Sequence, residues 1–246
     1  MGELLAVLSG KGGTGKTSVC AGLATALADA GLDVLCIDCD IGLRNLDISL
    51  GMSHISALSF ADVSQGGYSL DQAAVHPDYP KLRFLTAPMT CAPESVDSAA
   101  FLAMLNQARQ RFHYIFLDAP AGIDAGFRLA ARYADRVLLV TGSDPAAVRD
   151  ASRAAEVLEL MGKTHVRLIV NRIHPKMVSA MDLTVDDVMD RAGLPLIGIV
   201  PEDPNITLAA SFCQPVLKYA RYSDASRAFR RIALRVQGLN QPIKLR

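Results

Sequence analysis

Short apolar runs recur along the chain, each about long enough for one buried strand, and they alternate with segments of helical periodicity. The apolar runs predict strands over residues 4–9, 34–38, 82–86, 114–118, 136–141, 166–170 and 196–200. The segments between them predict helices over residues 17–30, 98–111, 123–132, 145–161, 185–191 and 223–236. This alternation is typical of an α/β fold with a mostly parallel central sheet and helices on both faces.

The domain organisation follows from what the pattern lacks. We find no internal repeat, low-complexity stretch or linker, and 246 residues suffice for one large α/β domain. We therefore predict a single domain over residues 1–236 and a short C-terminal tail over residues 237–246. The least regular region, residues 39–81, is long enough to suggest functional loops.

Composition agrees with a buried parallel sheet. Half of the residues (50%) are hydrophobic and the mean hydropathy is +0.24, as expected when strands are covered on both faces. No apolar run approaches the ~20 residues of a membrane-spanning helix. The N-terminus carries neither a basic region nor a cleavage site for secretion, so we expect a cytoplasmic protein.

Charge argues weakly against nucleic acid as a constitutive partner, because Lys+Arg and Asp+Glu are equal at 25 each. The C-terminal segment, residues 221–246, is nevertheless basic. It contains one acidic residue, Asp224, and seven basic ones: Arg221, Arg227, Arg230, Arg231, Arg235, Lys244 and Arg246. The sequence therefore predicts a basic end on a neutral protein.

Cysteine and histidine positions do not predict a metal or redox centre. The 5 cysteines are scattered, which disfavours a disulfide framework. Cys36 and Cys39 form a C-x-x-C pattern, but they flank an aspartate at a predicted strand rather than opening a helix. The histidines show no ligand spacing.

The strongest chemical signal is the sequence GKGGTGKT at residues 10–17, directly after the first apolar run. It fits the phosphate-binding pattern G-x-x-x-x-G-K-[ST], whose glycines let backbone N–H groups face phosphate oxygens. The following helix adds a favourable dipole, and Thr17 supplies a hydroxyl for Mg²⁺. The predicted phosphate-binding residues are Gly10, Lys11, Gly12, Gly13, Thr14, Gly15, Lys16, Thr17 and Ser18.

Polar residues follow several other predicted strands, and in open α/β sheets ligands bind at that edge. Asp118 ends an apolar strand, an arrangement that can hold a Mg²⁺-bound water. Asp38 and Asp40 would point the same way if their strand continued, so one of them could orient an attacking water; an Asx turn is the alternative. Further strand ends carry Asn171-Arg172 and Pro201-Glu202-Asp203.

With these residues placed, the chain resembles the MinD/ParA family of deviant Walker A ATPases, and most closely its MinD branch. The extra lysine of that family's loop is Lys11. The sequence motifs that support this resemblance are spread over nearly the whole chain: DCDIGLRNLD at 38–47, LDAPAGI at 117–123, AVRDA at 147–151, VNRI at 170–173 and GIVPED at 198–203.

The resemblance implies a P-loop NTPase fold and an ATPase of low basal turnover that uses ATP and Mg²⁺ and dimerises around the nucleotide. Lys11 would reach the partner's phosphates, Lys16 would hold phosphate oxygens in its own subunit, and Asp40 would position the attacking water. The implied metal-supporting residues are Thr17, Asp38 and Asp118. Adenine would be contacted by Asn171, Arg172, Pro201, Glu202 and Asp203.

The resemblance also implies partners and a location. Such proteins associate reversibly with the inner face of the cell membrane and meet a division inhibitor and an ATPase activator, the latter two near the helix that begins at Pro145. In that helix Ser152 stands where an acid is expected. Phe229, Ile232, Ala233 and Val236 form an apolar helical stripe that is either core or membrane-binding, and Pro242 opposes a helix through the tail.

Three alternatives remain at this point. A ParA-like or flagellar-number-type ATPase would act on DNA or on a protein partner. An iron–sulfur reductase of the nitrogenase iron protein type would need two suitably placed cysteines, but only Cys91 is roughly placed and residues 119–132 contain none. A nucleotide-gated module without hydrolysis would leave Asp40 and Lys11 without a role.

Overall fold

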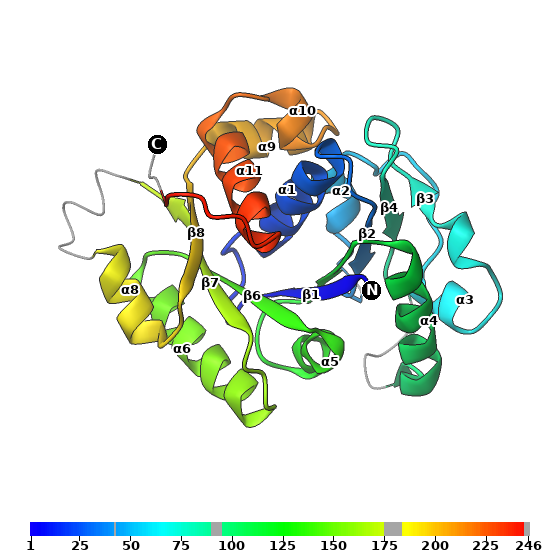
Figure 1. Ribbon diagram of the computed structural model, residues 1–246, viewed down its shortest axis with the longest axis horizontal. Coiled ribbons are helices and arrows are strands. Elements are labelled where there is room, and N and C mark those ends of the chain that lie inside the picture. Colours follow the sequence, from blue (N-terminus) through cyan, green and yellow to red (C-terminus); the bar gives the residue numbers. More distant parts are fainter. Residues whose placement is uncertain (42, 90–94, 175–183, 244–246) are drawn as a thin grey trace.

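A computed structural model describes residues 1–41, 43–89, 95–174 and 184–243. Its centre is one eight-stranded sheet with the order β3-β4-β2-β5-β1-β6-β7-β8, parallel except for β3 (Figure 1). The strands are β1 (Glu3–Leu8), β2 (Val34–Asp38), β3 (Ala74–Val75), β4 (Leu82–Leu85), β5 (Tyr114–Asp118), β6 (Arg136–Thr141), β7 (Val166–Ile173) and β8 (Leu196–Pro201).

Helices cover both faces of this sheet. One side carries α3 (Phe60–Ser64), α4 (Ser98–Arg111), α5 (Ala125–Tyr133), α6 (Pro145–Leu160) and α8 (Val185–Ala192). The other side carries α1 (Lys16–Asp29), α2 (Leu46–Leu50), α9 (Pro204–Ser211), α10 (Val216–Tyr219) and α11 (Asp224–Val236). A 3₁₀ turn, η1 (Leu70–Gln72), precedes β3. The predicted three-layer fold is confirmed.

Alternation along the strands divides the core into two clusters. Leu4, Ala6 and Leu8 of β1 pack into the cluster under α4, α5 and α6. Leu5 and Val7, which point to the opposite face, pack into the cluster under α1 and α11. Both faces of β1 are therefore buried, which fixes the strand in the middle of the molecule and holds its carboxyl end in one position.

The predicted strands and helices are all present, with boundaries shifted by a few residues. Asp144 caps α6 as expected, because its carboxylate accepts a hydrogen bond of 3.0 Å from the Ala147 N–H. The sequence patterns missed β3, α2, α3, α9 and α10, all of which are short. Most of these lie in the region that the sequence left as irregular loop.

The apolar stripe on α11 belongs to the core. Phe229, Ile232, Ala233 and Val236 are each at most 2% exposed. A side chain on Gly22 of α1 would lie 2.5 Å from the Phe229 ring, so the two helices meet at close range. A membrane-binding role for this stripe is therefore excluded in the folded chain.

The tail turns away from the helix at Gly238, which has a φ of 81°. Arg235 then donates hydrogen bonds to the carbonyl oxygens of Gln241 (3.0 Å) and Pro242 (2.6 Å). Leu239 and Ile243 are about half exposed. Lys244, predicted as part of the basic end, lies outside the described residues with Leu245 and Arg246. Within the described chain, we find no helix long and apolar enough to cross a membrane.

Candidate nucleotide site at the carboxyl edge of the sheet

Sheet order brings three sequence-distant strand ends together. The strand β5 lies between β1 and β2, and Asp118 is the register partner of both Val7 and Asp38. The phosphate loop follows β1 directly, so the loop and both aspartates share one edge of the sheet. This is the edge where open α/β sheets bind ligands, as the sequence predicted.

The phosphate loop depends on glycine for its path. Gly15 has a φ of 82°, and a Cβ there would lie 2.3 Å from the Asn171 Nδ2 atom. A Cβ on Gly10 would lie 2.2 Å from the backbone oxygen of Asp150, because α6 packs closely against the loop. Residues 11–13 at the tip are exposed, whereas Thr14 is buried. The loop is thus held from two sides while its tip stays open to a ligand.

Lys16 and Asp118 form a buried ion pair at the base of the loop. The Lys16 Nζ lies 2.7 Å from an Asp118 oxygen and also donates a hydrogen bond of 3.3 Å to the Thr17 hydroxyl. Burial lowers the pKa of Lys16, but the charge of Asp118 more than offsets this, so that the pKa lies above its usual value. Burial raises the pKa of Asp118, and Lys16 opposes that rise. The lysine therefore stays cationic in the interior.

Asp38 and Asp40 do not sit on one continuing strand. β2 ends at Asp38, whose carboxylate accepts hydrogen bonds from the Asp40 N–H (2.8 Å) and the Leu46 N–H (3.2 Å), forming an Asx turn. Burial, with the nearby charge of Asp118, raises the pKa of Asp38 to about 7. Asp40 is half-buried, and burial raises its pKa as well. Asp38 thus organises the turn that presents Asp40 at the edge.

Lys11 lies at the exposed tip of the loop. Its Nζ is 3.7 Å from an Asp144 oxygen at the start of α6, and 44% of its side chain is exposed. Such a surface pair is weak, so Lys11 is available to other anions. A cavity of about 230 Å³ lies beside it, lined by loop residues and by Gly142, Ser143 and Arg172.

A larger cavity, about 650 Å³, opens on the other side of the loop. Its lining contains all five residues predicted to contact adenine, Asn171, Arg172, Pro201, Glu202 and Asp203, together with Gly15 and Ser18 of the phosphate loop. The Asp203 carboxylate is already used, because it accepts hydrogen bonds from the Asn205 and Ala225 N–H groups. Asp203 therefore supports the wall by joining α9 to α11.

Several buried polar atoms around the loop lack a hydrogen-bond partner among the described residues: Ser9 Oγ, Thr14 Oγ1, Asn171 Oδ1 and His174 Nδ1. Buried polar atoms are normally paired, and an unpaired group points to a missing ligand or water. Mg²⁺ prefers oxygen ligands such as hydroxyl and carboxylate groups, so Thr17 and Asp118 fit that ion.

The structure adds residues that the sequence patterns did not indicate. His174, Pro204, Ile206, Thr207 and Leu208 complete the lining of the larger cavity. The only available sequence signal was Asp203-Pro204, an acid followed by proline that opens a helix, as at Asp144-Pro145. The other lining residues come together through packing alone.

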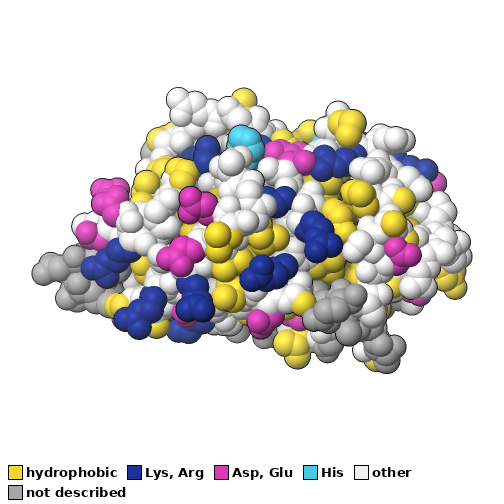
Figure 2. Space-filling model, turned by 90° about the horizontal axis from the view of Figure 1, so that it is seen from below, with side chains coloured by type: hydrophobic (Ala, Val, Ile, Leu, Met, Phe, Trp, Pro, Cys, Tyr) yellow, Lys and Arg dark blue, Asp and Glu magenta, His cyan; other side chains and the backbone are white. Residues whose placement is uncertain are grey.

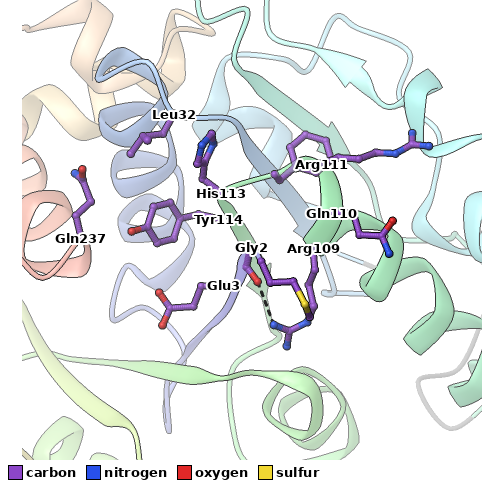
Figure 3. A pocket seen from close by; sticks show the side chains of 11 residues that line it. Gly2, Glu3, Leu32, Arg109, Gln110, Arg111, His113, Tyr114 and Gln237 are labelled. Carbon is purple, nitrogen blue, oxygen red and sulfur yellow. Dashed lines mark hydrogen bonds between the residues drawn. The ribbon is translucent and has the colours of Figure 1, made fainter.

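A cavity elsewhere in the described chain lacks the features of this site. A cavity of about 810 Å³ lies at the opposite end, where the amino ends of β1 and β5 meet (Figure 3). Its principal charges are paired, Arg109 with Asp135 and Glu3 with Arg136. No cluster of three or more His, Cys, Asp or Glu suited to a metal occurs in the described ranges. Cys91 lies outside them.

Comparisons with known proteins agree with this geometry. The sequence matches the CobQ/CobB/MinD/ParA nucleotide binding domain over residues 5–216. It is 37% identical to the septum site-determining protein MinD of Synechocystis sp., over 98% of this chain and 92% of that protein. The fold is similar to the MinC:MinD cell division protein complex of Aquifex aeolicus (TM-score 0.88, 34% identity, 98% of each chain). It is also similar to the septum site-determining protein MinD of Pyrococcus horikoshii complexed with Mg-ADP (TM-score 0.82, 27% identity, 96% of each chain).

Proposed function

This chain belongs to the CobQ/CobB/MinD/ParA family of nucleotide-binding domains, and we propose that it is a MinD-type ATPase that helps to position the division septum. The observation that carries the proposal is the convergence of the phosphate loop, Asp38 and Asp118 on one sheet edge beside a cavity large enough for a base. The reaction is hydrolysis of ATP to ADP and phosphate, with low turnover in the absence of an activator.

Phosphate binding relies on positioning and charge rather than on covalent chemistry. The loop N–H groups and Lys16 would hold the phosphates of ATP, and Thr17 and Asp118 would hold Mg²⁺. Mg²⁺ supplies positive charge against the phosphate oxygens. Lys16 is already cationic and held at the base of the loop, so it needs only to exchange Asp118 for phosphate oxygens.

Hydrolysis depends on an attacking water, which we assign to Asp40. The Asx turn at Asp38 holds Asp40 at the same edge as the loop. Asp40 is close enough to Lys16 for the lysine charge to lower its pKa, against the rise caused by burial. A half-buried carboxylate with a raised pKa is suited to orienting and polarising a water. Asp38 supports the turn behind it and would help to hold Mg²⁺.

Adenine recognition falls to the 650 Å³ cavity. The Oδ1 atom of Asn171 is a buried acceptor without a partner in the described chain, and it suits the 6-amino group of adenine. Pro201 and Ile206 provide apolar surface for the base, while Arg172 and Glu202 lie at the exposed rim. An acceptor here favours ATP over GTP, which has a carbonyl at that position.

Dimerisation would bring a second Lys11 to the phosphates. The weak pairing of Lys11 with Asp144 and its position at the loop tip support such a movement across an interface. A lysine supplied in this way couples hydrolysis to dimer formation. The ATP-bound dimer would then recruit partners, and hydrolysis of ATP would make the dimer dissociate.

Membrane association is assigned to the tail rather than to α11. Leu239 and Ile243 are exposed, and Lys244 and Arg246 of the sequence follow them. Aliphatic side chains and cations together suit an anionic lipid surface, and two tails on one dimer gain from effective concentration. We therefore propose a cytoplasmic protein that binds the inner face of the cell membrane reversibly.

The proposed protein partners are a Min-type division inhibitor and an ATPase activator. The face formed by α5, α6 and α8 shows basic and acidic side chains interspersed with apolar ones (Figure 2). Arg149 and Arg153 are exposed on α6, near the loop. A surface of this mixed kind is suited to a protein partner rather than to a polyanion, and its position beside Lys11 would make binding sensitive to the nucleotide.

The test is co-sedimentation of the full chain with anionic liposomes in Mg-ATP and in Mg-ADP, with a parallel DNA-retention assay. Binding to liposomes in ATP but not in ADP, without DNA retention, supports the proposal. Salt-sensitive DNA retention in ATP would instead support a ParA-like ATPase. Absence of nucleotide turnover would contradict the enzymatic part of the proposal.

A further inference from the structure

Two consecutive side chains at the end of β7 hold the tip of the phosphate loop. The Asn171 Nδ2 atom donates a hydrogen bond to the Thr14 carbonyl at 2.7 Å. The Arg172 Nη1 atom donates one to the Gly13 carbonyl at 2.8 Å. Successive side chains on a regular strand point to opposite faces, so one of these contacts requires an irregular backbone.

The irregularity is visible at Arg172 itself. Arg172 has a φ of 57°, in the left-handed region that a residue with a side chain rarely adopts. The pairing of β7 with β8 shifts register between Val170 and Ile173, which is the signature of a bulge. Bulges beside functional sites commonly re-aim a side chain, and here both Asn171 and Arg172 face the loop.

The two bonds determine where the loop amides point. In a trans peptide the carbonyl of one residue and the N–H of the next point in opposite directions. Holding the Gly13 and Thr14 carbonyls toward β7 therefore turns the N–H groups of Thr14 and Gly15 away from β7. Successive N–H groups turned in this way form a concave site for an anion.

The guanidinium of Arg172 is available to the phosphate loop. In the part of the chain that the structure describes, no carboxylate lies within ion-pair distance of its guanidinium. The side chain lines the cavities on both sides of the loop. Among the described residues, its hydrogen bond to the Gly13 carbonyl holds the head group, and its charge adds to the potential at the tip.

We propose that Arg172 is a positioning residue for the phosphate loop, re-aimed by the β7 bulge so that the Thr14 and Gly15 amides are preset to receive phosphate. The proposal rests on the nucleotide site described above. It assigns to Arg172 a task for the phosphates, in addition to its place at the rim of the base cavity. Asn171 joins the two tasks, because one amide group holds the loop and offers its oxygen to the base.

The experiment compares wild type with Arg172→Ala, Arg172→Gly and Arg172→Lys. Affinities for Mg-ADP and for base-free inorganic tripolyphosphate are measured by calorimetry, and loop amides are followed by NMR in the free protein. We expect Arg172→Ala to weaken both ligands by about tenfold, the effect of losing one charge-assisted hydrogen bond. The Thr14 and Gly15 amides should become more mobile, and Arg172→Lys should restore part of the affinity.

Arg172→Gly separates positioning from general stability. Glycine adopts the left-handed backbone without strain, so the midpoint of thermal unfolding should be maintained or raised while both affinities fall. Arg167→Ala is the matched control, because Arg167 lies at the other end of β7 and donates to the carbonyl of Val166. It should leave both affinities unchanged.

Two results would overturn the inference. One is unchanged loop-amide mobility with unchanged affinities in Arg172→Gly. The other is a loss of ADP affinity with tripolyphosphate affinity intact, which would make Arg172 a base contact only. If wild type binds neither ligand, the proposed nucleotide function fails instead, and the amide mobility still reports on the contact between Arg172 and the loop.

Discussion

The Nζ atom of Lys16 lies 2.7 Å from Asp118, and only 6% and 1% of the two side chains are exposed. The two residues are 102 positions apart in the chain and meet because β1 and β5 are neighbours. Both are proposed to bind Mg-ATP: Lys16 would bind the phosphates, and Asp118 would help to hold the Mg²⁺ ion. Their opposite charges neutralise one another in the core.

This ion pair predicts a large cost for removing one partner. Lys16→Met leaves the Asp118 carboxylate buried and unpaired, which should lower the free energy of unfolding by about 3–5 kcal/mol. The double variant Lys16→Met/Asp118→Leu should recover much of that loss. Urea unfolding without nucleotide measures both, and a single variant as stable as wild type would show that the pair is solvated.

The role proposed for Asp40 predicts that its removal affects ATP hydrolysis but not ATP binding. Asp40→Ala should bind Mg-ATP with little change but reduce turnover by about a hundredfold or more, since orientation of the water is lost. The dimer should then accumulate in ATP, as measured by light scattering with phosphate release. Asp71→Ala, an exposed acid on η1, is the control. Unchanged turnover in Asp40→Ala would favour a nucleotide-gated module without hydrolysis.

The tail predicts a loss of membrane binding without a loss of fold. A chain ending at Gln237 keeps every buried residue of α11, so its free energy of unfolding should change by less than about 1 kcal/mol. Liposome binding in ATP should disappear while ATP hydrolysis persists. In contrast, Phe229→Ala should cost about 3–5 kcal/mol of stability, because that ring fills the core against α1. Liposome binding that survives the truncation would contradict the assignment.

His76 predicts a dependence of stability on pH. Its Nε2 lies 2.8 Å from the Leu50 carbonyl, and its Nδ1 accepts from the Asp78 and Tyr79 N–H groups. Burial lowers the pKa of His76 below its usual 6.5. The unfolded chain therefore binds the proton first as pH falls, and the stability present above about pH 6.5 declines below it.

The measurement for His76 is the urea midpoint of wild type and His76→Gln from pH 7.5 to 5.0. The decline should be smaller in the variant, because the residue that titrates has been removed. His113→Gln is the control, since the His113 side chain is exposed and lies beside Asp33 rather than in the core. Equal pH slopes in wild type and His76→Gln would assign the effect to other groups.

The sequence by itself determined the class of fold and the phosphate loop. Both depend on local patterns: apolar strands, capped helices such as α6, and a run of glycines before Lys16-Thr17. Each of these signals spans only a few residues, because hydrophobic periodicity, helix capping and glycine backbone freedom act between close neighbours in the chain. The strand ends could be matched to one edge because parallel strands share a direction.

Only the tertiary structure decided the remaining questions, because they depend on contacts between distant segments. The stripe around Phe229 has the same periodicity whether it packs on α1 or on a membrane, and packing selected the core. The strand at Asp38 ended in an Asx turn, which changed how Asp40 is presented. The aim of Arg172 toward Gly13 follows from a bulge between β7 and β8, and strand register is a property of two strands together that neither sequence specifies alone.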